Sequence, residues 1–199
     1  MASKKFNNVY IKDNFSIVGP LEKDGLLKNY NLVMDDYYYG EKTFEQAEIK
    51  MQKIVLNNLL SKNNLSENKI DLLLGGDLIN QISISSYNAS KFNIPYLGVY
   101  SACATYVEEL ILGASLISGK LAKNIVVITS SHNLNAERQF RYPVEYGAAK
   151  KHTTTFTTTA AVSSLLTNEP TNIKLESATV GKAIDMGIND TNNMGAVMA

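Results

Sequence analysis

The chain has 199 residues, of which 45% are hydrophobic, and its 19 acidic and 19 basic side chains leave no net charge. This length allows one or two domains with a real core, and the charge balance argues against bulk electrostatic binding of nucleic acid. A single cysteine excludes a disulfide scaffold and fits a reducing compartment. Because we find no signal peptide and no apolar stretch of roughly 18 residues, we expect a soluble, cytoplasmic protein.

The first part of the chain predicts two short strands, a loop and a long helix. Residues 9–11 and 16–18 are expected as strands, and residues 20–42 lack a period and are expected as a loop. Residues 43–46, Thr-Phe-Glu-Gln, form a capping-box pattern ahead of apolar residues at helical spacing. We expect this helix to end near residue 63.

The middle of the chain predicts buried strands that alternate with helices. Residues 70–74 are an unbroken apolar run, which indicates a strand buried on both faces and closed by a turn at residues 75–77. Within that turn, Asp77 is expected as a helix N-cap or a cleft residue, beside Asn80 and Gln81. A second helix is expected over residues 80–92. Pro95 opens another expected strand, which leads to Cys103. Further strands are expected over residues 124–129, 153–162 and 173–180.

Cys103 is placed where a strand turns into a helix that Gly119 ends. Free backbone N–H groups and the helix dipole at that point favour the thiolate, so Cys103 is a candidate nucleophile or a polar contact in an anion site. The alternative is a small buried packing residue. Apolar side chains surround most of the following helix, so we expect it to be covered on nearly all sides.

The order of these elements predicts an α/β sheet with right-handed crossovers. Residues 130–151 are expected as a polar and aromatic loop, followed by an antiparallel strand. Within this loop Arg138 and Arg141 either contact a ligand carboxylate or join an internal network with Glu137 and Glu145. His132 is a polar contact or a structural hydrogen-bonding residue, and His152 is expected as a solvated loop residue.

Three segments carry a specific resemblance: residues 76–81, residues 130–132 and residues 136–147. They resemble the stage V sporulation protein AD family of the thiolase-like superfamily, of which this chain would be about the N-terminal three-fifths. The resemblance implies a duplicated α-β-α-β-α thiolase fold with two buried central helices, one of them starting at Cys103. Residues 1–170 would form the N-terminal half, and residues 171–199 would begin the C-terminal half.

The resemblance also implies a function: binding of dipicolinic acid and its uptake into the developing spore, on a non-catalytic scaffold. It implies membrane proteins of the same sporulation system as partners, a peripheral location at the forespore or spore inner membrane, and calcium as a companion of the ligand. We expect no other cofactor or metal. The sequence does not decide between a monomer and a homodimer. The candidate ligand-binding residues are Cys103, Ser131, His132, Arg138, Arg141 and Asp77.

Two other classes of function stay open. In a Cys-dependent acyltransferase of the thiolase or ketoacyl synthase type, Cys103 would be the nucleophile, although the sequence shows no matching catalytic base. In a scaffold protein, the main task would be docking to the membrane partners. Residues 157–161 also lack the glycines that the resemblance leads us to expect.

Overall fold

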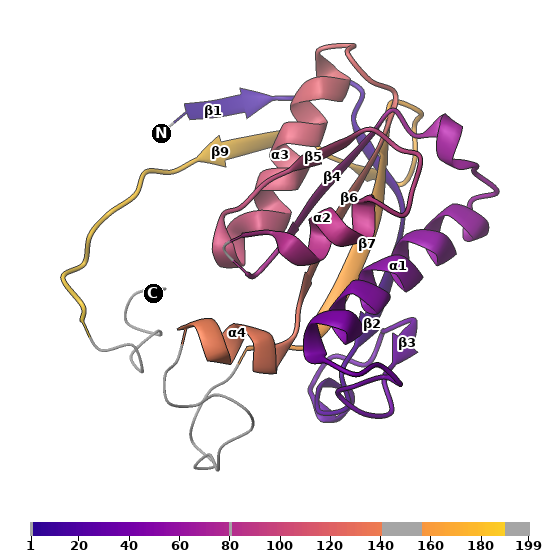
Figure 1. The fold of residues 1–199 in the computed structure, drawn as a ribbon. Coiled ribbons are helices and arrows are strands. Elements are labelled where there is room, and N and C mark those ends of the chain that lie inside the picture. Colours follow the sequence, from indigo (N-terminus) through magenta and orange to yellow (C-terminus); the bar gives the residue numbers. More distant parts are fainter. Residues whose placement is uncertain (1, 80, 141–156, 190–199) are drawn as a thin grey trace.

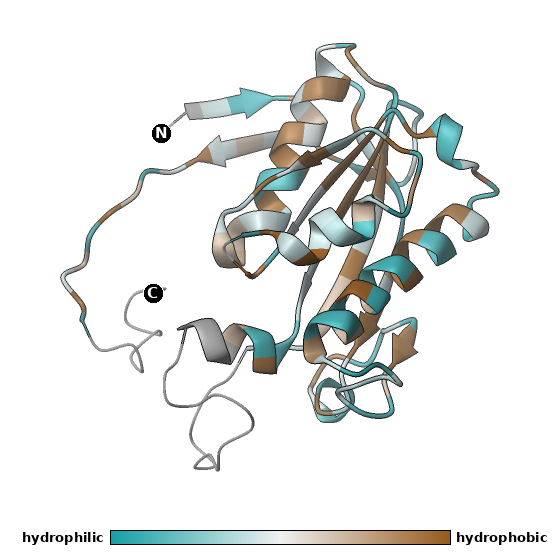
Figure 2. Cartoon of the chain, in the orientation of Figure 1, coloured by the Kyte–Doolittle hydropathy of each residue, from teal (hydrophilic) through white to brown (hydrophobic). Residues whose placement is uncertain are grey.

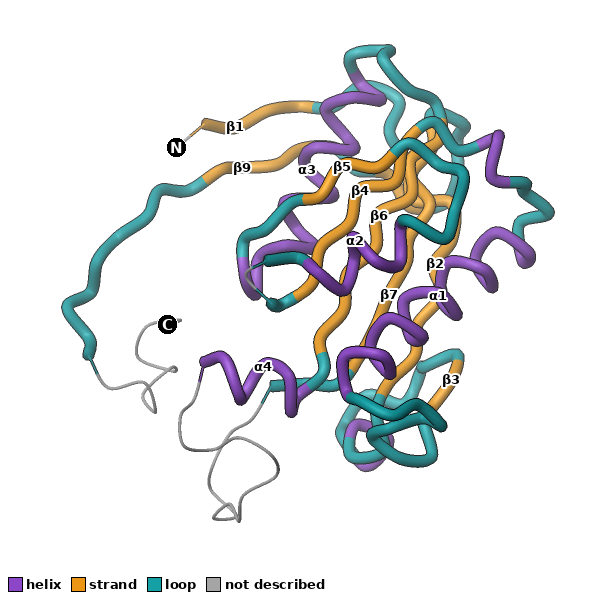
Figure 3. Tube along the Cα trace, in the orientation of Figure 1, coloured by secondary structure: helices purple, strands orange, loops and turns teal. Residues whose placement is uncertain are grey.

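The computed structural model describes residues 2–79, 81–140 and 157–189. In this part of the chain, a seven-stranded sheet carries helices on both faces, and a separate two-stranded ribbon projects beside it (Figures 1 and 3). The strands are β1 Ala2–Lys5, β2 Tyr10–Val18, β3 Leu32–Val33, β4 Leu72–Asp77, β5 Tyr96–Gly98, β6 Asn124–Ser131, β7 Ala160–Thr167, β8 Ile173–Lys174 and β9 Ser177–Val180. The helices are α1 Phe44–Lys62, α2 Ser83–Ala89, α3 Thr105–Ser118 and α4 Asn133–Phe140, with short 3-10 turns at Glu22–Asp24, Glu67–Lys69 and Ala102–Ala104. None of the described helices is long and apolar enough to cross a membrane.

The sheet combines parallel and antiparallel strands. Its order is β3-β2-β7-β6-β4-β5, with β8 also paired to β2, while β1 pairs with β9 in the ribbon. Strand β4 runs parallel to both β5 and β6, whereas β7 is antiparallel to its neighbours β2 and β6. The carboxyl ends of β4, β5 and β6 therefore lie at one edge of the sheet, where Asp77 is paired with Ser130.

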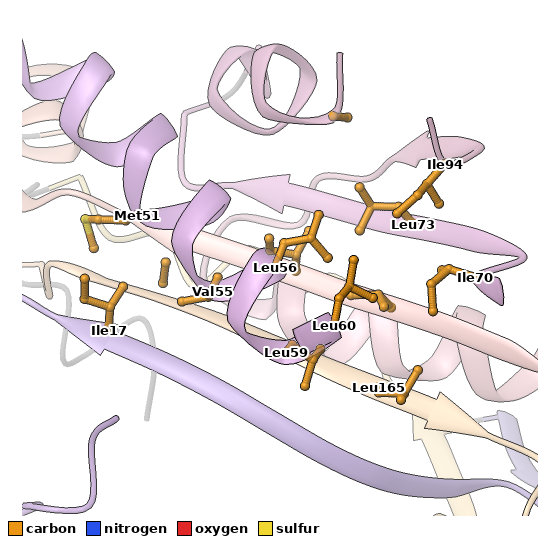
Figure 4. Close-up of a cluster of buried hydrophobic side chains, with 14 of the residues drawn as sticks. Ile17, Met51, Val55, Leu56, Leu59, Leu60, Ile70, Leu73, Ile94 and Leu165 are labelled. Atoms are coloured by element: carbon orange, nitrogen blue, oxygen red, sulfur yellow. The ribbon is translucent and has the colours of Figure 1, made fainter. Parts of the chain in front are cut away.

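The two faces of the sheet belong to two separate cores. Leu73 and Leu165 pack into the core beneath α1 and α2, whereas the next residues, Leu74 and Leu166, pack into the core beneath α3. Adjacent residues of a strand point to opposite faces, so both faces need apolar side chains. Figure 2 draws much of the central strands β4 and β6 in brown. Figure 4 shows the first core, in which Met51, Val55, Leu56, Leu59 and Leu60 of α1 meet the strands.

Helix α1 begins where the capping-box pattern predicts. The Thr43 hydroxyl accepts a hydrogen bond from the Gln46 amide at 3.2 Å, which satisfies one of the free N–H groups of the first turn. The Gln46 side chain accepts from the Lys42 amide at 3.3 Å, one residue before the cap. The predicted helix is confirmed, ending at Lys62.

Two strand predictions were wrong in their bounds. The two short strands expected at residues 9–11 and 16–18 are one strand, β2, because a register shift between Ile11 and Asp13 lets the pairing with β7 continue. Lys62 donates to the Asp13 carboxylate at 2.7 Å and so compensates its charge within the strand. The turn expected at residues 75–77 is also strand, since β4 continues to Asp77.

The remaining corrections fall after residue 80. Helix α2 is shorter than residues 80–92, and α4 occupies part of the loop expected at residues 130–151. Strand β7 begins at Ala160, later than the expected start at residue 153, and is antiparallel as predicted. The strand expected over residues 173–180 is divided into β8, which pairs with β2, and β9, which pairs with β1.

Candidate functional site

The candidate site lies at the edge of the sheet where β4, β5 and β6 end. Asp77 is the last residue of β4 and Ser131 the last residue of β6, while β5 ends at Gly98, five residues before Cys103. Ligands of α/β sheets commonly bind outside the carboxyl ends of the strands, because the loops that follow can vary without disturbing the sheet.

Cys103 is exposed on a strained turn that leads directly into α3. It lies in the 3-10 turn Ala102–Ala104, and the preceding Ala102 has a left-handed backbone with φ of 46°. The Thr105 hydroxyl fixes the turn by accepting from the Ser101 amide at 3.0 Å and donating to the Ala102 carbonyl at 2.8 Å. A buried packing role for Cys103 is therefore wrong. Backbone strain of this kind is concentrated at functional sites.

Gly76 lets this turn close onto the sheet. A Cβ atom on Gly76 would lie 2.4 Å from Thr105 Cγ2 and 2.6 Å from the Val99 carbonyl oxygen, closer than real Cβ contacts. Only glycine allows this approach of backbone to backbone. The position of the Cys103 turn relative to β4 therefore depends on Gly76.

Asp77 is fully buried, and both of its carboxylate oxygens are engaged. Oδ1 accepts from the Ile79 amide at 3.0 Å, and Oδ2 accepts from the Ser85 amide at 2.8 Å and the Ser85 hydroxyl at 2.9 Å. Burial raises the pKa of Asp77, and the hydrogen bonds from Ser85 oppose that rise. Asp77 thus binds the first turn of α2 from the sheet, but the N-cap position itself is Ile82, with a left-handed φ of 44°.

His132 is fully buried just after β6. Its Nε2 lies 2.9 Å from the Tyr37 carbonyl oxygen and its Nδ1 accepts from the Leu134 amide at 3.3 Å, so we assign the neutral tautomer with the proton on Nε2. The Phe44 ring stacks on the imidazole with centroids 5.0 Å apart. Burial lowers the pKa of His132. Both ring nitrogens have partners within the chain, which is typical of a histidine with a structural role.

A buried polar network behind this edge was missed by sequence reasoning. Glu48 of α1 accepts from the Ser130 hydroxyl and from the Asn135 side-chain amide, each at 2.8 Å, and Gln52 donates to Ser130 at 2.9 Å. Burial raises the pKa of Glu48 to about 7, and the hydrogen bond from Asn135 opposes this rise. The sequence carried a signal of this network. Phe44, Glu48 and Gln52 follow one another at four-residue spacing, which places them on one face of the helix. The polar Glu48 and Gln52 therefore share that face with the buried Met51 and Val55.

Glu109 is a second buried carboxyl group that the sequence reasoning missed. It lies on α3 with no exposed surface, and no charged side chain pairs with it in the described structure. A Cβ atom on Gly76 would lie 3.3 Å from its Oε1, so the group packs against β4 beneath the Cys103 turn. Burial, with the charge of Glu108 next, raises the pKa of Glu109 to about 10, and the side chain is neutral at pH 7.

Comparison with known proteins identifies the family. A model of the stage V sporulation protein AD family matches residues 2–199. The chain is 41% identical over 192 residues to stage V sporulation protein AD of Bacillus subtilis (strain 168), covering 96% of this chain and 57% of that protein. The chain belongs to the stage V sporulation protein AD family. It spans little more than half the length of this curated relative.

Solved structures confirm that this member of the stage V sporulation protein AD family has a thiolase-like α/β fold. The 3-oxoacyl-[acyl-carrier-protein] synthase III of Aquifex aeolicus VF5 matches with a TM-score of 0.53 and 15% identity, over 80% of this chain and 53% of the synthase. A single-residue variant of OleA from Xanthomonas campestris matches with a TM-score of 0.53 and 13% identity, over 82% of this chain and 59% of that chain. At these identities the likeness concerns the fold alone.

The structure describes only some of the remaining predicted site residues. Ser131 is at the edge, where its hydroxyl donates to the Thr158 carbonyl. Arg138 lies in α4, which extends from that edge. Arg141, His152 and Asn80 fall outside the described residues. Among the described residues, no group of three or more His, Cys, Asp or Glu side chains is arranged to hold a metal ion.

Proposed function

We propose that this protein binds dipicolinic acid and assists its uptake into the developing spore, on a thiolase-like scaffold that does no catalysis. The observation that carries the proposal is the exposed Cys103 turn at the carboxyl edge of the sheet, in a chain that belongs to the stage V sporulation protein AD family. His132, the histidine that the structure describes, has both ring nitrogens engaged within the chain. It is therefore poorly suited to activate the thiol as a base, and this supports binding over catalysis.

The proposed site combines groups that suit a planar dicarboxylate. Cys103 and the backbone N–H groups of its turn would contact the ligand, and Ser131 lines the same edge. Arg138 and Arg141 would supply the forked donors that match carboxylates. Asp77 and His132 would hold the edge in place rather than contact the ligand, because their polar atoms are already paired. Calcium is part of the proposal, since it would offset the ligand's charge beside the buried Asp77.

A Cys-dependent acyltransferase is the second candidate function. The exposed thiol and the left-handed Ala102 next to it are the observations that favour it. In that case Cys103 would take an acyl group from a thioester, with release of the thiol carrier, and would stay labelled after incubation with an acyl-CoA. The absence of such a label would contradict the acyltransferase function and favour the binding function.

The proposal includes the partners and location that the resemblance implies, namely membrane proteins of the same sporulation system at the forespore or spore inner membrane. A homodimer is supported by β5, which is an edge strand of the described sheet. Leu97 and Tyr100 are exposed there, and residues 92–107 contain no charged side chain. Exposed edges are normally protected by charge, so this edge suits a second copy of the chain.

A thermal melt with and without dipicolinate tests the binding function. At a free ligand concentration about 100 times the dissociation constant, linkage predicts about 2.7 kcal/mol of stabilisation. The same melt with calcium added tests whether the ion takes part. Picolinate, with one carboxylate, is the matched control and should stabilise much less.

The Cys103→Ala variant locates the site. We expect it to melt as the wild type does without ligand, because the side chain is exposed, and to lose most of the dipicolinate shift. A cooperative melt of the wild type with no shift at any dipicolinate concentration would contradict a site in this chain.

A further inference from the structure

Glu48 is a buried carboxyl group that reaches the edge of the candidate site from α1, whose start lies beside α4 (Figure 1). It has no exposed surface, and its Oε1 accepts from Ser130, which is paired with Asp77 at the end of β4. Its Oε2 accepts from Asn135 in the first turn of α4. One carboxyl group therefore contacts both the end of β6 and the helix that follows it.

Buried hydrogen bonds fix the first turn of α4. The Asn133 amide donates to the Thr159 hydroxyl at 2.9 Å, and that hydroxyl donates to Asn133 Oδ1 at 3.0 Å. Together with the bond from Asn135 to Glu48, these contacts hold the start of a helix that carries Arg138. A change in the hydrogen bonding of Glu48 therefore acts on the helix that carries a predicted ligand-binding residue.

The network around Glu48 is short of hydrogen-bond donors. Asn135 Oδ1 and Gln52 Oε1 are both buried, and neither has a hydrogen-bond partner among the described residues. A proton on Glu48 would supply a donor, because the Asn135 side-chain amide can turn by about 180° and present Oδ1 to the protonated carboxyl group. The contact between α1 and α4 can thus take two forms. An ionised Glu48 accepts from Nδ2 of Asn135, and a neutral one donates to Oδ1.

The acidic groups that face Glu48 oppose its ionisation. Burial is the main cause that raises the pKa of Glu48 to about 7, and the hydrogen bond from Asn135 opposes this rise. The charges of Asp77, at the end of β4, and of Glu45, on α1, add to the rise. An ionised Glu48 would therefore add a further negative charge behind an edge that already holds Asp77.

The other elements that pack against α1 add little charge near Glu48. Helix α2 and strand β7 contain no acidic or basic side chain, and α4 carries one of each sign at residues 137–138. Strand β2 contributes Asp13, which is paired with Lys62 in the last turn of α1. His132, between β6 and α4, has a pKa lowered from 6.5 and is neutral at pH 7. We therefore expect the charge of this edge to change near pH 7 through Glu48.

We propose that Glu48 regulates the dicarboxylate site, which binds its ligand tightly when Glu48 is protonated and weakly when Glu48 is ionised. The proton removes a negative charge behind the edge at which the ligand carboxylates would lie, and like charges repel more strongly within a protein than in water. It also sets the Asn135 amide, and with it α4, in the neutral arrangement. The inference rests on the proposed binding of dipicolinate at this edge. Because such coupling is reciprocal, ligand binding must take up a proton from solvent near pH 7.

Calorimetric titration with dipicolinate at about pH 6 and about pH 8 tests the proposal. Both ligand carboxylates stay ionised over this range, so the charge of the ligand does not change. We expect the wild-type dissociation constant to rise about three- to tenfold, the order expected for like charges roughly 15 Å apart at an effective dielectric constant of about 20. Titrations at about pH 7.5 in two buffers of different ionisation enthalpy should show proton uptake on binding.

Glu48→Gln imitates the protonated residue. Its amide nitrogen can donate to Asn135 Oδ1, and its oxygen can accept from Ser130. We expect this variant to bind dipicolinate at about pH 8 as tightly as the wild type does at about pH 6, without proton uptake. Glu169→Gln is the matched control, because Glu169 is 67% exposed and follows β7, which ends at the opposite edge of the sheet. It should keep the pH dependence of the wild type.

Two results would overturn the inference alone. One is a wild-type dissociation constant that stays the same or falls from pH 6 to pH 8. The other is a Glu48→Gln variant that keeps the pH dependence and the proton uptake. If the wild type instead binds no dipicolinate at either pH, the proposed function itself is overturned, and this regulation with it.

Discussion

Two residues beside the candidate site hold a left-handed backbone although neither is glycine. Ala102 precedes Cys103 with φ of 46°, and Ile82 precedes α2 with φ of 44°. A β-branched residue such as Ile82 is a genuine outlier in this region, and such strain persists only where the surroundings enforce it. Around Ala102 those surroundings are the hydrogen bonds of Thr105 and the close packing on Gly76.

Replacing Ala102 with glycine should make the protein slightly more stable. A left-handed alanine costs roughly 1–2 kcal/mol, and the greater backbone freedom of glycine in the unfolded chain offsets about 0.5–1 kcal/mol of the relief. We therefore expect Ala102→Gly to raise the free energy of unfolding by up to about 1 kcal/mol in urea titration. Ala104→Gly is the control, because Ala104 has φ of −93°, where glycine brings only the entropic cost. A loss of stability in both variants would mean that the turn at Ala102 is not strained.

At the scale of elements, the contact between β4 and the start of α3 decides where the thiol is held. Gly76→Ala would place a methyl group 2.4 Å from Thr105 Cγ2, so the turn must move away from β4. We expect a loss of about 1–3 kcal/mol in the free energy of unfolding, as for other overpacked sites, and a changed rate of Cys103 alkylation by iodoacetamide. Gly181→Ala, which has nothing within 4 Å of its new methyl group, should change neither. An unchanged alkylation rate in Gly76→Ala would contradict this dependence.

The same contact shows what the sequence could and could not predict. The apolar runs and the capping pattern predicted α1, the core of β4 and β6, and the antiparallel β7. These features depend on residues that are close together in the sequence. The extension of β4 through Gly75 and Gly76 could not be predicted, since it depends on α3 and β5 packing there from later in the sequence. Glu109 was missed for the same reason, because its burial comes from distant elements. Glu48 was missed although its spacing with Gln52 on α1 carried a signal, because its partners Ser130 and Asn135 come from distant elements. Cys103 was found from its local position between strand and helix.

At the scale of the whole molecule, the sheet buries carboxyl groups on both of its faces. Glu48 comes from α1 on one face and Glu109 from α3 on the other, and neither has any exposed surface. Their pKa values are raised from 4.5 to about 7 and about 10, so the folded protein keeps both protons over a pH range in which the unfolded chain has released them. Stability must therefore fall as pH rises, opposite to the usual effect of a salt-bridged carboxylate.

Glu109→Gln should remove most of this pH dependence above about pH 8, where Glu48, with a pKa of about 7, is largely ionised. In the wild type, the proton kept by Glu109 makes the free energy of unfolding fall by about 1.4 kcal/mol per pH unit until the pKa of about 10 is reached. Glutamine has nearly the same shape and cannot ionise, so the variant should be more stable than the wild type in urea titrations at about pH 8, and its stability should change little from there to about pH 9. Glu169→Gln is the control, because that side chain is 67% exposed, and it should keep the wild-type slope. A wild-type stability that rises with pH across this interval would contradict a protonated Glu109 in the folded protein.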